Sequence, residues 1–179
     1  MAAIQIDEWW PGAPNRPWQQ IVEMLAEVLH AAVHDGASVG FILPFPLDEA
    51  RAYWTDKVLP DVRARKRRLL LAWDGAVVVG TVHINLDTMP NQAHRAEVSK
   101  LLVHPNSRRG GIARALMKEL EEIARAEGRT LLTLDTRTGD SAEPLYLSLG
   151  YVMVGAIPRF ARAPDSVALD ATSILYKEL

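Results

Sequence analysis

The stretch AEVSKLLVHPNSRRGGIARALMKELEEIARAEG, residues 96–128, decides the fold of this chain. Its first part is an apolar run that predicts a strand over residues 96–103, followed by a Pro-Asn-Ser turn. Two arginines and two glycines come next. Apolar residues then recur at the spacing of one helix face over residues 112–127, and Gly128 predicts the end of that helix.

The arginines and glycines stand where the predicted helix begins. A helix start presents unpaired N–H groups and a partial positive charge. Gly110 and Gly111 let an anion approach that backbone, while Arg108 and Arg109 add charge. The segment therefore predicts a pyrophosphate site; the alternative is a surface turn whose arginines face water. Neither G-x-x-x-x-G-K-[ST] nor G-x-G-x-x-G is present at this turn, which excludes those two nucleotide-binding motifs there.

Composition bounds the class of protein. A length of 179 residues with 49% hydrophobic residues predicts one domain over residues 1–179, with an irregular, Pro- and Trp-rich segment at residues 1–17. The formal net charge of −2 argues against a nucleic-acid partner. The absence of cysteine excludes disulfides, thiolate nucleophiles and cysteine-ligated zinc. Because we find neither a signal peptide nor a membrane-spanning run, we expect a cytoplasmic protein without a membrane partner.

The remaining elements follow from hydrophobic periodicity and turn residues. The pair Asp74-Gly75 joins two apolar runs and predicts a β-hairpin over residues 68–86. The alternation of helices and strands predicts an α/β (α+β) fold in which helices flank a mixed sheet. The other predicted elements are helices over 19–34, 47–59 (with Asp48 as N-cap) and 141–149, strands over 130–136, 151–156 and 172–179, and a long loop over 157–170.

Two motifs then indicate a family. Residues 108–113 fit R-x-x-G-x-A, and PLYLSLGYVMVG (144–155) is similar to L-Y-x-x-x-G-[FY]. In this order and spacing, the sequence resembles the GNAT superfamily of acyl-CoA N-acyltransferases. The resemblance implies the GNAT fold, with a mostly antiparallel sheet splayed between two central strands, and acetyl-CoA as co-substrate. Further segments are similar to a toxin-inactivating member of that family.

The resemblance also implies an activity, for which alternatives stay open. We expect direct transfer of acetyl to a primary amine of a small molecule, because no cysteine is available to carry an acyl group. One alternative acceptor is a protein N-terminus or lysine side chain. A CoA-binding sensor without catalysis is the other alternative. A homodimer is an open question.

The cofactor-binding residues are carried over from the family motifs. The strand before the turn would pair its backbone with pantetheine, the turn would donate amides to the pyrophosphate, and a bulge is expected in this strand. The family often has an asparagine where this chain has Gly139, and Ser141 could replace its hydrogen bond. The predicted cofactor-binding residues are Leu101, Leu102, Val103, Arg108, Arg109, Gly110, Gly111, Ile112, Ala113 and Ser141.

Three residues are predicted to move protons. A protonated acceptor amine needs a base, and Glu97 and Asp135 lie on the two strands expected to splay apart. As alternatives, Glu97 pairs with a neighbouring Arg95 or Lys100, and Asp135 caps a turn. Tyr146 falls on the family's tyrosine position and would serve the thiolate leaving group as an acid. Its alternative role is packing.

Three more residues are predicted to bind the acceptor. Arg159 and Phe160 lie in the predicted loop over 157–170, and long loops in compact domains are often functional. Phe41 is predicted to bind the acceptor only because its segment is similar to that of the toxin-inactivating family member. His30 and His34 share a helix face, but no third ligand is evident, so we predict no metal site.

Overall fold

Seven strands form one sheet in the computed structural model, which describes residues 4–13 and 16–179. The strand order is β1-β2-β3-β4-β5-β7-β6, and neighbouring strands are antiparallel except for the parallel pair β4–β5. The predicted fold class is thereby confirmed. The strands are β1 Gln5–Trp9, β2 Arg67–Asp74, β3 Val77–Asn85, β4 Arg95–Val103, β5 Leu131–Arg137, β6 Val152–Arg162 and β7 Leu169–Glu178. The helices are α1 Trp18–His34, α2 Leu47–Ala52, the π-helical segment η1 Tyr53–Val58, α3 Leu59–Arg63, α4 Ile112–Ala126 and α5 Ala142–Ser148, with short 3₁₀ turns η2 Pro90–Gln92 and η3 Pro105–Ser107.

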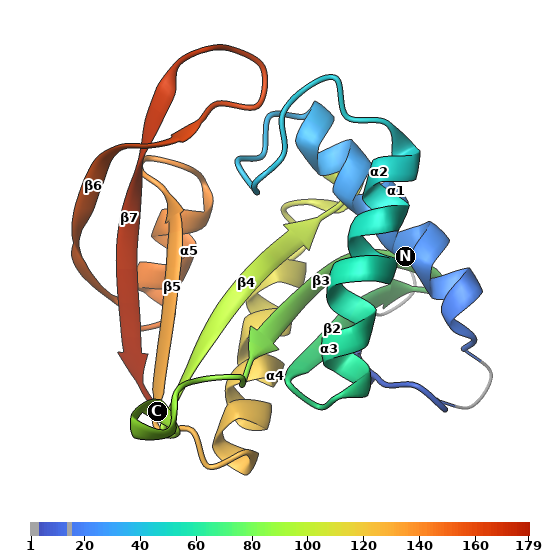
Figure 1. Cartoon of the computed structure of the whole chain (residues 1–179), viewed down its shortest axis with the longest axis horizontal. Coiled ribbons are helices and arrows are strands. Elements are labelled where there is room, and N and C mark those ends of the chain that lie inside the picture. The colour runs from blue at the N-terminus through green and yellow to red at the C-terminus, as the bar shows by residue number, and fades with distance from the viewer. Residues whose placement is uncertain (1–3, 14–15) are drawn as a thin grey trace.

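The sheet divides into two parts between β4 and β5. These strands pair only over Arg95–Glu97 and Leu131–Thr133, and then they diverge. Figure 1 shows α1 and α2 over one face of β2–β4 and α4 behind the same strands, whereas β5, β7 and β6 lead away with α5. We call β5, β6, β7 and α5 the arm. The predicted splaying between the two central strands is therefore present.

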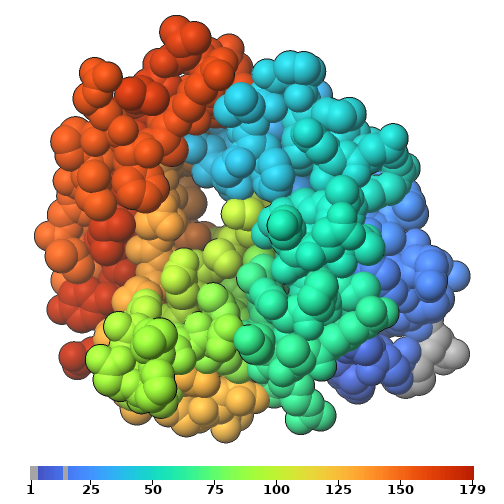
Figure 2. Space-filling model, viewed as in Figure 1, coloured from blue at the N-terminus to red at the C-terminus, as the bar shows by residue number. Residues whose placement is uncertain are grey.

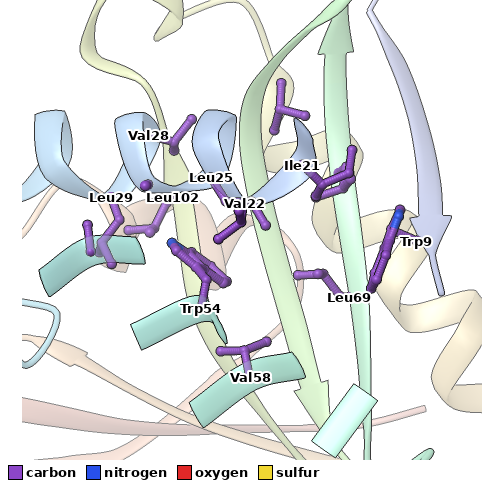
Figure 3. Close-up of a cluster of buried hydrophobic side chains, with 14 of the residues drawn as sticks. Trp9, Ile21, Val22, Leu25, Val28, Leu29, Trp54, Val58, Leu69 and Leu102 are labelled. Carbon is purple, nitrogen blue, oxygen red and sulfur yellow. The ribbon is translucent and has the colours of Figure 1, made fainter. Parts of the chain in front are cut away.

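A hydrophobic core fixes the helical layer on the sheet. Trp54 of η1 is fully buried and lies among side chains of α1, including Leu25 and Leu29 (Figure 3). Leu102 of β4 joins the same cluster. Because full burial of a side chain of this size contributes about 1.5–3 kcal/mol, this cluster holds β4 in place beside the helices.

The strand–turn–helix stretch folds as its residues predict. The buried positions Ile112, Leu116, Leu120 and Ala124 recur along one face of α4 and pack on the sheet. The helix begins after Gly111, whose φ of 79° is readily adopted only without a side chain. The predicted helix at residues 19–34 and the strands on either side of the hairpin are also confirmed.

The prediction of an irregular segment at residues 1–17 is wrong for β1. Residues 5–9 pair antiparallel with β2, and Trp9 is buried against the core. The ring of Trp18 lies 4.8 Å from that of Trp9. So short a strand carries little periodicity of its own, and pairing with β2 supplies its order.

The loop predicted over residues 157–170 is wrong in its greater part. β6 continues to Arg162, and β7 begins at Leu169. Register shifts between Ile157 and Ala161 accommodate Pro158 and the positive φ of Arg159 as a bulge.

Three smaller predictions also need correction. Asp48 is not an N-cap, because the helix starts after Pro46 and Asp48 lies in its first turn. The predicted helix over 47–59 widens into a π-helical segment before Pro60 enters the first turn of α3. The hairpin turn is Gly75-Ala76 rather than Asp74-Gly75, since Asp74 already pairs with Val77.

Candidate active site

A cleft of about 1070 Å³ opens where β4 and β5 separate. Its walls are the end of α1 with residues 35–40, β4, the start of α4, β5, α5 and the β6–β7 hairpin. Figure 2 shows this hollow between the arm, the segment after α1 and β4. The cleft therefore lies between the helix-covered part of the sheet and the arm.

One wall of the cleft is an open backbone edge. β4 pairs with β3 along its length, but its pairing with β5 ends at Glu97. The following residues of β4, including Leu101, Leu102 and Val103, line the cleft with main-chain groups that β5 does not reach. Such an edge can bind an extended ligand as an added strand.

The expected bulge lies in the middle of this edge. Thr81 pairs with Leu102 and His83 pairs with Ser99, so Lys100 and Leu101 together face the single residue Val82. Lys100 adopts a φ of 53°, in the left-handed region that residues with a side chain seldom visit. The bulge bends β4 away from β5 and turns Lys100 into the cleft.

The start of α4 presents backbone N–H groups and two arginines at one end of the cleft. Its N-cap, Gly111, makes no side-chain hydrogen bond to the helix, so the first N–H groups have no side-chain cap. Arg108 donates from Nε to the carbonyl oxygen of Val103 at 3.2 Å and forms an ion pair with Asp35 at the end of α1. Arg109 has a φ of 65° and is exposed.

Of the predicted cofactor-binding residues, all except Gly110 line the cleft. A Cβ added to Gly110 would come no closer than 3.9 Å to the backbone oxygen of Ser107, so packing does not demand glycine there. Ser141 lines the cleft, but its hydroxyl already donates to Oδ1 of Asp140 at 3.2 Å.

Tyr146 of α5 lines the cleft with a side chain that is only 6% exposed. Its ring packs edge-on against Tyr151, with centroids 5.7 Å apart. Burial raises the pKa of Tyr146, and the negative charges of Asp135 and Asp140 raise it further. The phenol therefore keeps its proton at physiological pH and can donate a hydrogen bond into the cleft.

The two predicted carboxylates occupy different places. Asp135 of β5 lines the cleft, and its Oδ2 accepts a hydrogen bond from the Thr172 hydroxyl at 2.9 Å. Glu97 lies at the last paired position of β4, opposite Thr133, and does not line the cleft. Its predicted alternative partner, Arg95, instead donates to Thr133 Oγ1 at 3.0 Å and to Gln92.

Of the three predicted acceptor-binding residues, one lines the cleft and two do not. Phe160 lines the cleft from the bulge in β6, whereas the exposed Arg159 beside it does not. Phe41 packs in an aromatic cluster, with ring centroids 4.5 Å from Phe45 and 5.2 Å from Tyr53. Residues 35–40 line the cleft, whereas Phe41, the next residue, does not.

Lys100 is a cleft residue that the sequence reading missed. It figured there only as a partner for Glu97, because a bulge that redirects a side chain depends on the neighbouring strand. Burial lowers its pKa; the charge of Asp135 opposes this shift, Arg67 adds to it, and Glu97 opposes it.

The chain was compared with known proteins. The model of the acetyltransferase (GNAT) family matches residues 41–151, which include the open edge of β4, the turn before α4 and Tyr146. The chain belongs to the GNAT acetyltransferase family. This membership confirms the predicted enzyme class, an acyltransferase that works with acetyl-CoA.

Individual GNAT proteins are similar to this chain either in part of its sequence or in its fold. A mycothiol acetyltransferase from Thermomonospora curvata is 35% identical over 106 residues, which are 59% of this chain and only 30% of that protein. A ribosomal-protein-alanine N-acetyltransferase from Brucella melitensis has a TM-score of 0.77 at 21% identity, covering 98% of this chain and 99% of that one. A candidate acetyltransferase from Salmonella typhimurium, solved with its cofactor acetyl-CoA, has a TM-score of 0.75 at 18% identity, covering 99% and 94%.

Within residues 4–13 and 16–179, no group of three or more His, Cys, Asp or Glu side chains could hold a metal ion. In the same part of the chain, no helix is long and apolar enough to cross a membrane.

Proposed function

We propose that this GNAT protein transfers acetyl from acetyl-CoA directly to a primary amine of a small molecule. The observation that carries the proposal is a single cleft that joins the open edge of β4 and the start of α4 to Asp135 and Tyr146. Family membership supports the acetyl donor, and the shape of the cleft supports the class of acceptor.

The cleft fits the donor by the chemistry of its walls. The uncapped N–H groups at the start of α4 and the charge of Arg109 suit a pyrophosphate. The edge formed by Leu101–Val103 suits the amides of pantetheine, and an N–H near Leu102 would hold the thioester oxygen. When bound there, the thioester supplies the acetyl group.

Asp135 is the better placed of the two candidate bases. Its carboxylate lines the cleft, and Thr172 orients one of its oxygens while leaving the other free to accept a proton from the amine. Glu97 lies outside the lining residues, so it would act through water or through its charge.

Tyr146 would serve the leaving thiolate. Because burial raises the pKa of its phenol above that of a thiol, full proton transfer to the thiolate would be unfavourable. A hydrogen bond from the phenol to the developing negative charge needs no such transfer and would stabilise it.

The closure of the cleft favours a small acceptor over a protein. The N–H of Leu43, in the segment between α1 and α2, donates to the carbonyl oxygen of Pro164 in the β6–β7 turn at 2.8 Å. This hydrogen bond joins the segment that follows residues 35–40 to the β6–β7 turn, and Ala163 and Pro164 are buried beside it. An extended peptide would need this bridge to open, whereas a small amine would not.

A role in detoxification is favoured by a specific likeness. Segments including HDGASVGF (34–41) and LLTLDTRTG (131–139) resemble the tabtoxin resistance protein, a GNAT enzyme that inactivates a β-lactam toxin. Residues 35–40 and 135–137 of these segments line the cleft. The likeness supports an amine-bearing toxin or antibiotic as one acceptor class.

A thiol-release assay tests the proposed function. The purified chain is incubated with acetyl-CoA and a panel of small amines, aminated antibiotics and peptides with free N-termini. Release of CoA with small amines only is the expected result. Turnover of peptides alone would favour a protein acetyltransferase, and acetyl-CoA binding without turnover of any acceptor would favour a sensor; either result contradicts the proposal.

A further inference from the structure

A half-buried lysine lines the cleft with no carboxylate partner among residues 4–13 and 16–179. This residue is Lys100, which enters the cleft from the bulge of β4. Its Nζ lies 5.7 Å from the centroid of the Tyr53 ring, and a Cβ placed on Gly40 would lie 4.0 Å from it. The ammonium group thus sits between η1 and the segment after α1.

Two arginines of the cleft already have carboxylate partners. Arg108 pairs with Asp35, and Arg137 pairs with Asp140 and Asp170. Among residues 4–13 and 16–179, no carboxylate lies within 4.0 Å of the Lys100 ammonium.

Two features of Lys100 are energetically unfavourable. An unpaired cation in a partly desolvated wall is unfavourable, which agrees with the lowered pKa of Lys100. The left-handed backbone of the same residue costs about 1–3 kcal/mol more. A ligand that brings a negative charge to the ammonium would offset the first of these costs.

The surroundings indicate where such a ligand would lie. Arg67, which pairs with Asp61 at 2.8 Å, adds positive potential at Lys100. Asp135 acts on Lys100 from the other side of the cleft with the opposite charge. The cleft thus presents a cation, Lys100, and an anion, Asp135. These charges are complementary to a ligand that carries an anionic group near its amine.

We propose that Lys100 binds an anionic group of the acceptor, so that the preferred acceptor is a primary amine carrying a carboxylate or phosphate close to its amino group. This inference rests on the proposed function. Lys100 is then a specificity-determining residue: it selects among amines, while Asp135 and Tyr146 act on the reacting atoms.

Matched pairs of acceptors test the inference. Each α-amino acid is compared with its carboxamide, and O-phosphoethanolamine with ethanolamine, with concentrations corrected for the fraction of free amine. We expect kcat/KM to favour the anionic member of at least one pair by tenfold or more. The amino-acid and phosphate pairs distinguish the two sources of negative charge.

Three variants assign the preference to Lys100. Lys100→Met should lower the anionic-to-neutral ratio of kcat/KM by about 10–100-fold, the size expected for a hydrogen bond to a charged group. Lys100→Arg should retain part of the preference. Lys118→Met, which removes an exposed lysine of α4 outside the cleft, should leave the ratio unchanged. Thermal unfolding of each variant checks that it is folded.

Failure of the inference and of the proposed function can be distinguished. If neutral and anionic amines react equally well, or if Lys100→Met lowers both rates by the same factor, Lys100 does not select the acceptor, and the proposed function stands. If acetyl-CoA binds and no amine of the panel reacts, the proposed function is overturned together with this inference.

Discussion

The helix-covered part of the sheet and the arm differ in how they are packed. Residues 78–84 of β3 are buried between α1 on one face and α4 on the other, whereas residues 152–160 of β6 are exposed throughout. The backbone that suits the donor, in β4 and α4, belongs to the packed part. The arm supplies Asp135, Tyr146 and Phe160. Donor binding thus depends on the closely packed part of the sheet, whereas acceptor chemistry depends on residues of the arm, which is less stable.

Removing a large side chain from each part gives the largest expected contrast. Trp54→Ala should lower the free energy of unfolding by about 3–5 kcal/mol, because it leaves a cavity in a fully buried cluster. Val154→Ala, at a β6 residue that is 69% exposed, should change it by less than about 0.5 kcal/mol. Chemical denaturation measures both, and equal effects would show that the two parts are equally packed.

Gly111→Glu should weaken acetyl-CoA binding by about 100–1000-fold. The variant forces a side chain into a φ of 79° and places a negative charge where the helix start suits an anion. Gly128→Glu is the matched control, since Gly128 has a φ of 70° at the opposite end of the same helix. Calorimetry should show weakened binding only for Gly111→Glu; equal losses would indicate general destabilisation instead of a lost anion site.

Tyr146→Phe should lower kcat about 100-fold and change the dissociation constant of acetyl-CoA by less than about threefold. Tyr151→Phe is its control, because the buried Tyr151 hydroxyl has no hydrogen-bond partner among the described residues. Since burial raises the pKa of Tyr146, its ionisation should produce no loss of kcat below about pH 10. A wild-type rate for Tyr146→Phe would assign the residue to packing.

Asp135→Asn should lower kcat/KM about 10–100-fold, and Glu97→Gln by less than about tenfold. The difference follows from their positions, because Asp135 lines the cleft and Glu97 does not. A larger loss for Glu97→Gln than for Asp135→Asn would identify Glu97 of β4, in the packed part of the sheet, as the base.

Asp35→Asn should produce the smallest effect, tightening acetyl-CoA binding by about 2–5-fold. The substitution releases Arg108 from its ion pair and removes a negative charge next to the turn before α4. Asp48→Asn removes a comparable exposed partner, that of Arg51, away from the cleft, and should leave binding unchanged. Weaker binding by Asp35→Asn would show that Asp35 instead holds Arg108 in its productive orientation.

The best sequence predictions concern short-range features. The helix start at Gly111, the strand before it and the short helix with Tyr146 each depend on a few adjacent residues, through periodicity and allowed backbone angles. Predictions failed where pairing with another strand overrides the local signals of a segment. Thus β1 is a strand because it pairs with β2. The segment with Pro158 and Arg159 is part of a bulged strand because β6 pairs with β7.

The sequence by itself determined the family, the order of most elements and the turn that suits a pyrophosphate, because those signals are local. Only the tertiary structure decided that Phe41 lies outside the cleft lining, that Leu43 donates to Pro164, and that Lys100 lines the cleft with no carboxylate partner among the described residues. The physical reason is that these three outcomes depend on strand register and on contacts between segments far apart in the chain.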